Sequence, residues 1–150
     1  MNWKSSFAVL AVAVLMAAPL LAEKDEKDPL KGVKCPVSGK AAVQCAADHN
    51  GGKVYFCCGK CAAAFKKDNT KFVAKANHQL YVTKQAKLEK CIYSGKKLNG
   101  ETVIEVAGAK VCFCCPKCKA KAEKAEDVIA AVFNDKAFAK GFKVAKKEKK

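Results

Sequence analysis

The chain has 150 residues, with 29 Lys+Arg against 14 Asp+Glu and a formal net charge of +15 at pH 7. Every one of these basic residues is a lysine, so the chain lacks the planar guanidinium group that reads bases and phosphates through paired hydrogen bonds. This composition argues against specific nucleic-acid binding. It favours a solvated basic surface, whose partners would be an acidic protein, a polysaccharide or a membrane surface.

The first 22 residues have the three parts of a secretory signal peptide. Lys4 gives a positive start, residues 7–16 form an uncharged apolar stretch, and cleavage is expected near Ala22. The apolar run over residues 7–22 is shorter than the roughly 20 residues that span a bilayer, which favours cleavage over a membrane anchor. We therefore expect a secreted or periplasmic protein.

Both ends of the remaining chain are strongly charged. Residues 23–34 contain Pro29 and Gly32 and show no apolar period, which predicts a flexible leader. Residues 143–150 form a basic tail. Ordered structure is expected to begin at Cys35.

Between these ends the chain is a tandem duplication. GGKVYFCCGKC at positions 51–61 returns 57 residues later as GAKVCFCCPKC at positions 108–118. Each copy also has a matching start, KCPVSGK at 34–40 and KCIYSGK at 90–96. Because two separate parts of each copy agree, the pattern indicates a true internal repeat.

The duplication predicts two small modules. We expect the first over residues 35–80, a connector over 81–90, and a second, diverged module over 91–142. A cysteine knuckle opens each module, and a β-hairpin and helices follow it. The expected fold class is therefore α+β.

In the first module, strands are expected at 42–46 and 53–57, because the residues between them are typical of a turn. Good helix formers follow from Cys61, and a short helix is expected at 70–76.

In the second module, β-branched and aromatic residues predict strands at 102–106 and 110–113. Helices are expected at 117–133 and 136–142.

The ten cysteines offer the staples that modules of this size need. Three recur in the same order in each copy: Cys35, Cys57 and Cys61, then Cys91, Cys114 and Cys118. A cysteine at a strand start, brought by a hairpin to cysteines at a helix N-terminus, is typical of small zinc modules. Helix N-termini stabilise thiolates, and clustered thiolates suit Zn²⁺ or Cu⁺ rather than Mg²⁺ or Ca²⁺.

These residues resemble a known group of proteins. The matching positions are Cys35, Tyr55, Phe56, Cys57, Cys61 and Phe65. They are similar to the YHS and TRASH group of small metal-binding domains, and this resemblance implies a treble-clef-like fold and a role in heavy-metal handling. It covers the second copy less well, because Cys112 and Ala122 replace Tyr55 and Phe65.

The same resemblance bears on the ligand set. YHS-type domains commonly have a second cysteine where this chain has Ser38 and Ser94, and a serine where it has Cys58 and Cys115. If the gained cysteine replaces the lost one, the metal ligands are Cys35, Cys57, Cys58, Cys61, Cys91, Cys114, Cys115 and Cys118. Because adjacent strand residues point to opposite faces, the fourth ligand of each site requires a backbone turn between the paired cysteines.

The remaining candidates lack a counterpart in the other copy. Cys45 and Cys112 fit either small buried side chains or a disulfide. His49 lies in a polar turn and His78 follows a predicted helix, so we expect both on the surface rather than among the metal ligands.

Three functions follow from these patterns, and none of them indicates an oligomeric state. The first is a secreted, non-enzymatic binder of a thiophilic metal ion, in storage, buffering, delivery or a structural role. The second is a disulfide-stapled interaction module with a basic surface, because export exposes thiols to oxidation. The third is a thiol-disulfide redox protein that uses the C-x-x-C sequences at 58–61 and 115–118.

Overall fold

The structure, a computed structural model, describes residues 30–145. The expected signal peptide, residues 23–29 of the leader and residues 146–150 of the basic tail lie outside the described residues. Within residues 30–145, no helix has the length and apolar character needed to cross a membrane.

The first repeat opens with a tight turn and continues with a hairpin and two helices. In the turn, Gly39 N–H donates to Cys35 O at 2.8 Å. The elements that follow are β1 (Cys45–His49), β2 (Gly52–Phe56), α1 (Gly59–Lys67), α2 (Val73–Val82) and β3 (Ala86–Leu88). Residues 81–90, expected to be a connector, thus contain the end of α2 and all of β3.

The second repeat has the same order with one additional helix. Its elements are β4 (Asn99–Val106), β5 (Ala109–Phe113), α3 (Pro116–Glu123), α4 (Val128–Phe133), α5 (Asp135–Gly141) and β6 (Phe142–Val144). The expected helix over 117–133 is divided, because Asp127 caps a new helix by accepting from Ala130 N–H at 3.0 Å.

The two hairpins have the same turn. Asn50 and Gly51 both have positive φ, 48° and 84°, as do Ala107 and Gly108 with 48° and 81°. Two such residues match the twist of the strands they connect, and this makes a two-residue turn. In the first repeat the short turn pairs Cys45 with Phe56. The strand expected at residues 42–46 is therefore β1, which begins three residues later, at Cys45.

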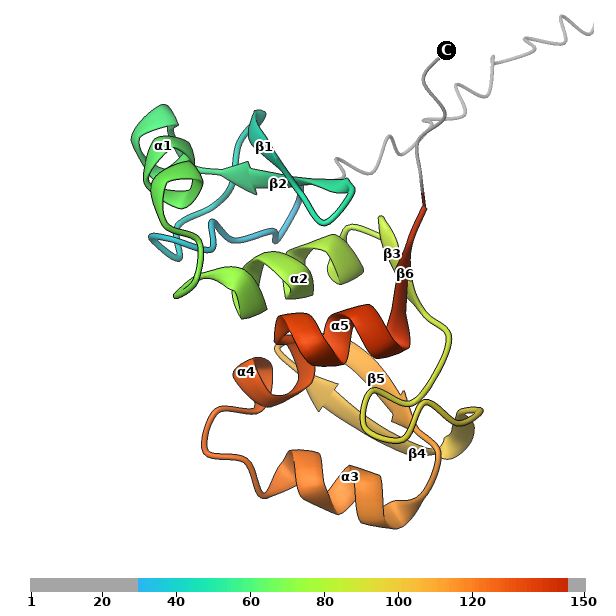
Figure 1. Cartoon of the computed structure of the whole chain (residues 1–150). Coiled ribbons are helices and arrows are strands. Elements are labelled where there is room, and N and C mark those ends of the chain that lie inside the picture. Colours follow the sequence, from blue (N-terminus) through green and yellow to red (C-terminus); the bar gives the residue numbers. More distant parts are fainter. Residues whose placement is uncertain (1–29, 146–150) are drawn as a thin grey trace, which may run out of the picture.

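The two repeats pack together. Figure 1 shows α2 and α5 in the middle of the molecule, with the β1–β2 hairpin beyond α2 and the β4–β5 hairpin beyond α5. The last strands of the two repeats, β3 and β6, pair antiparallel, with Ala86 opposite Val144 and Leu88 opposite Phe142. Buried side chains from both repeats belong to one continuous core, which includes Phe56, Leu80, Phe113 and Phe133.

A polar network also joins the repeats. The fully buried Asn77 of α2 donates to Phe133 O at 2.9 Å and to Asp135 Oδ1 at 3.2 Å. Its own Oδ1 accepts from Asn50 at 2.8 Å and lies 3.0 Å from His49 Nε2. The side chain of Asn77 therefore holds the first hairpin turn against the α4–α5 corner of the second repeat.

Each repeat has a pair of contacting aromatic rings, but one ring of the pair comes from a different position in the second repeat. In the first repeat Phe56 packs on Phe65, with ring centroids 5.2 Å apart. The residue that corresponds to Phe65 is Ala122, but Phe113, which corresponds to Phe56, stacks on Tyr93 at 6.0 Å. The second ring has moved from the helix to the turn, so the divergence leaves this part of the core filled.

Candidate metal centres

Each repeat brings three cysteine sulfurs together. The Sγ atoms of Cys35, Cys57 and Cys61 all lie within 4.8 Å of one another, and so do those of Cys91, Cys114 and Cys118. We call these groups site 1 and site 2. In site 1, Cys35 lies in the opening turn, Cys57 directly follows β2 and Cys61 lies in the first turn of α1.

The sulfur spacing fits a tetrahedral metal ion. Zn–S bonds of about 2.3 Å in a tetrahedron place the sulfurs about 3.8 Å apart. The Sγ separation is 3.6 Å between Cys57 and Cys61 and 3.7 Å between Cys114 and Cys118. All ten cysteines are free thiols in this structure. The three sulfurs of each site are therefore close enough together to hold one metal ion between them.

The most buried cysteine of each site has a pKa below the ordinary value of a thiol. Burial raises the pKa of Cys35, but hydrogen bonds from the Ser38 side chain and from neighbouring backbone N–H groups outweigh burial and lower it to about 7. The corresponding balance, with Ser94 as the side-chain donor, lowers the pKa of Cys91 to about 6. Both thiols thus have thiolate character at neutral pH.

The helix cysteines show the opposite shift. The hydrogen bond to Cys57, together with burial, raises the pKa of Cys61 to about 12. Burial and the hydrogen bond to Cys114 raise the pKa of Cys118 to about 12. Three sulfurs this close cannot all ionise without a cation, whereas a bound soft cation would replace the retained protons.

A serine side chain contacts each site. Ser38 Oγ is 3.1 Å from Cys57 Sγ, and Ser94 Oγ is 3.1 Å from Cys114 Sγ. The serines therefore occupy the knuckle position expected for them and contact the cluster directly.

The predicted fourth ligands lie at the edge of the sites. Cys58 Sγ is 3.8 Å from Cys57 Sγ, and Cys115 Sγ is 3.7 Å from Cys114 Sγ. Each is the N-cap residue of the following helix, so the backbone does turn after the cysteine pair. Neither belongs to the groups in which all sulfurs lie within 4.8 Å. Cys58 is exposed, which makes it the most accessible thiol of site 1.

Cys45 and Cys112, which have no counterpart in the other repeat, lie outside both sites. Cys45 faces Phe56 across the first hairpin, and Cys112 faces Val103 across the second. Both side chains are partly buried.

The expectation that both histidines lie on the surface is wrong. His49 is only 8% exposed, and its ring packs edge-on against Phe65 at 5.3 Å. His78 is partly buried, lies 3.2 Å from Val106 O and packs against Phe133. Sequence reasoning placed His49 in an exposed polar turn, but His49 ends β1 and contacts Phe65 and Asn77, whereas Asn50 and Gly51 of the turn are exposed. Among the described residues neither histidine joins a cysteine group.

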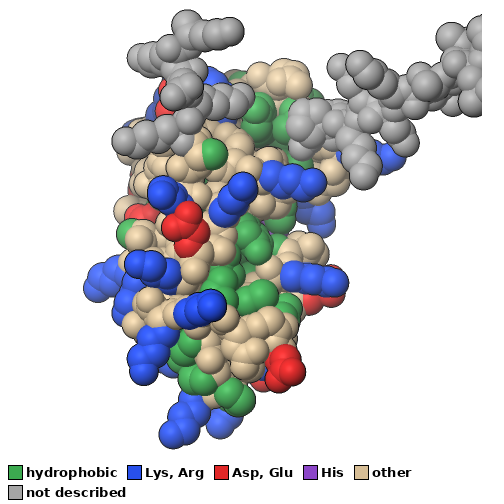
Figure 2. Space-filling model, turned by 90° about the vertical axis from the view of Figure 1, so that its right-hand side faces the viewer, with side chains coloured by type: hydrophobic (Ala, Val, Ile, Leu, Met, Phe, Trp, Pro, Cys, Tyr) green, Lys and Arg blue, Asp and Glu red, His purple; other side chains and the backbone are tan. Residues whose placement is uncertain are grey.

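The surface of the described part of the chain is rich in lysine. Figure 2 shows lysine side chains spread over one face of the molecule, with few acidic side chains between them. Within residues 30–145 the ion pairs are those of Lys53 with Asp48, Lys119 with Glu123 and Lys143 with Glu89, all of them on exposed or partly exposed side chains. Most lysines of the described part therefore have no carboxylate partner.

Comparisons of this chain with family models, with curated proteins and with solved structures gave no match. The functional assignment therefore depends on the geometry of the two cysteine sites.

Proposed function

We propose that this protein is an exported, non-enzymatic binder of a thiophilic metal ion, with one ion in each repeat. The observation that carries the proposal is the repeated convergence of three cysteine sulfurs within 4.8 Å. Neutral thiols packed this closely gain little from one another, whereas thiolates around a soft cation gain strongly. The signal peptide expected at residues 1–22 supports export.

Zn²⁺ is the metal that we propose, with Cu⁺ as the alternative. The triads would supply three thiolates to each ion, and Cys58 or Cys115 would complete a set of four. The resemblance to YHS and TRASH domains, with their treble-clef-like fold, supports the three-cysteine core of each site, and Cys58 or Cys115 would replace the knuckle cysteine that this chain lacks. Because Cys58 is exposed while Cys35 is buried, an incoming ligand would reach the ion of site 1 from the Cys58 side. Such access favours storage, buffering or delivery over a purely structural ion.

Mass spectrometry of the exported protein tests the proposal. The full-length chain is expressed with its signal, and the product is isolated without chelator or reductant. We expect a native mass that includes two metal ions and, after denaturation, alkylation of at least eight cysteines, namely the six of the two sites together with Cys58 and Cys115. A metal-free mass, lowered by about two daltons for each of several disulfides, would instead establish the stapled interaction module.

The redox alternative has its own assay. If the C-x-x-C sequences exchange disulfides, the metal-free protein should reduce or isomerise a disulfide substrate with turnover. We expect no turnover.

A further inference from the structure

A second candidate site lies between the two repeats. A cavity of about 570 Å³ is bounded by residues 31–36 of the N-terminal segment and by one side of α2. The second repeat closes it with the hairpin turn at Ala107 and Gly108 and with Ile129 of α4. Ligand cavities in proteins have volumes of about 300–1,000 Å³, so this one has room for a small organic molecule.

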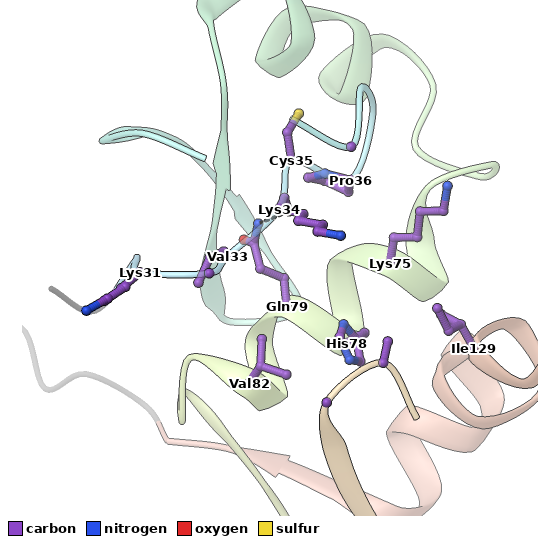
Figure 3. Close-up of a pocket in the computed structure, with 14 residues that line it drawn as sticks. Lys31, Val33, Lys34, Cys35, Pro36, Lys75, His78, Gln79, Val82 and Ile129 are labelled. Carbon is purple, nitrogen blue, oxygen red and sulfur yellow. Dashed lines mark hydrogen bonds between the residues drawn. The ribbon is translucent and has the colours of Figure 1, made fainter. Parts of the chain in front are cut away.

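The charged residues at the cavity all have one sign. Lys31, Lys34 and Lys75 line it, and within residues 30–145 no acidic residue does. None of the three forms an ion pair with the described part of the chain. Figure 3 shows Lys34 extending from the N-terminal segment toward α2, which carries Lys75, while Lys31 points away toward the other end. Two ammonium groups, from separate segments, therefore lie at one end of the cavity without an ion-pair partner among residues 30–145.

Most of the remaining side chains of the wall are apolar, and Gln79 and His78 are the polar ones. Val33, Pro36, Val82 and Ile129 contribute side chains to it. His78 also lines the cavity, but its Nε2 lies 3.2 Å from Val106 O, so the imidazole already has a partner in the wall. Apolar walls with a few charged groups at one end match a ligand that has an apolar body and a charged head.

We propose that this cavity binds a small organic anion. Its anionic head would lie between Lys34 and Lys75, and its apolar body would contact Val82 and Ile129. The ammonium groups attract a negative head and reject a positive one, and the apolar walls give an organic anion an advantage over an inorganic ion. The ligand would contact both repeats. Cys35 of site 1 also lines the cavity, but its sulfur points away from it in Figure 3, so the proposed ligand contacts do not involve a metal-binding sulfur.

A matched pair of fluorescent probes tests the proposal on the protein as isolated, with its metal content intact. The anionic probe is 8-anilinonaphthalene-1-sulfonate, and N-phenyl-1-naphthylamine has the same rings without the sulfonate. We expect saturable binding of one anionic probe per protein, at least about tenfold tighter than the neutral probe, as for a charge-assisted contact. Equal affinities for the two probes would overturn the assignment of an anion site.

Variants then locate the site. The double variant Lys34→Gln and Lys75→Gln should weaken binding of the anionic probe about tenfold. The control, Lys87→Gln with Lys97→Gln, removes the same charge at two exposed positions outside the cavity and should leave binding unchanged. Equal losses in the control and the double variant would show attraction to the general positive charge, and would overturn the proposal. Val82→Glu places a carboxylate in the wall and should abolish binding. Because that variant can unfold, thermal melting is measured for each protein, and the lysine changes, on exposed side chains, decide the outcome.

Discussion

Asn77 gives a direct test of whether the two repeats fold as one unit. Its side chain is fully buried and bonds to the second repeat at Phe133 O, 2.9 Å away, and at Asp135 Oδ1, 3.2 Å away. It also holds the first hairpin turn through Asn50 and His49. Asn77→Ala removes all four contacts and leaves the buried Phe133 carbonyl without this donor.

The size of the effect follows from these contacts. Each buried hydrogen bond contributes about 1 kcal/mol, and a buried group left without its partner costs about 1–3 kcal/mol. Alanine in the middle of α2 returns about 0.5 kcal/mol of helix propensity. We therefore expect a loss of about 3 kcal/mol in the free energy of unfolding. With a slope of about 2 kcal/mol per molar urea, the midpoint should fall by about 1.5 M.

The assay must report on each repeat separately. Cys35 and Cys91 are 1% and 0% exposed, so an alkylating pulse labels each of them only when its own repeat opens. Labelling of both across a urea series, read by mass spectrometry, should shift together in Asn77→Ala. Asn69→Ala, at an exposed position between α1 and α2, is the matched control and should shift neither. A shift confined to Cys35, or a loss below about 1 kcal/mol, would refute the view that the network joins the repeats.

Three further predictions concern the sites and the pH response. Cys61→Ser should remove one of the two bound metal ions and lower the melting temperature, whereas Cys45→Ser should retain both ions in native mass spectrometry; loss of metal from both variants would contradict the triad assignment. If Cys58 completes site 1, Cys58→Ser should keep the ion but lose it to a competing chelator at least about tenfold faster, and an unchanged rate would exclude it as a ligand. Burial lowers the pKa of His78 below its ordinary value of 6.5, so the unfolded chain binds the proton first as the solution is acidified. Stability should therefore be complete above about pH 6.5 and fall as the pH drops through the lower folded pKa, and His78→Gln should flatten this part of the urea-midpoint profile.

Much of the local structure could be predicted from the sequence. Alternation of β-branched and aromatic residues predicted the β4–β5 hairpin, and the alanine-rich and lysine-rich stretches predicted helices after each cysteine pair. The predicted boundaries of strands and helices were less accurate where a single turn or capping side chain determines them. The two-residue turn at Asn50 and Gly51 sets where β1 begins, and the capping carboxylate of Asp127 divides the helix expected over 117–133.

The cysteine sites could likewise be predicted only in part from the sequence. The repeated spacing of cysteines was enough to predict that Cys35, Cys57 and Cys61 meet, because a hairpin returns the chain to its start. Sequence spacing alone could not decide whether Ser38 or Cys58 lies closer to the cysteine triad. Both lie within 4 Å of Cys57 Sγ, and only the coordinates show that one is in the turn and the other at an exposed helix cap.

The sequence by itself determined the duplication, the α+β composition and the two groups of cysteines, because each depends on residues that are close along the chain or joined by a single hairpin. Only the tertiary structure decided that the repeats share one core, that β3 pairs with β6, and that His49 is buried. The cavity beside Lys34 and Lys75 is also a product of that packing. The physical reason is that these contacts join segments far apart in sequence, and hydrophobic periodicity shows that a face is buried without showing what buries it.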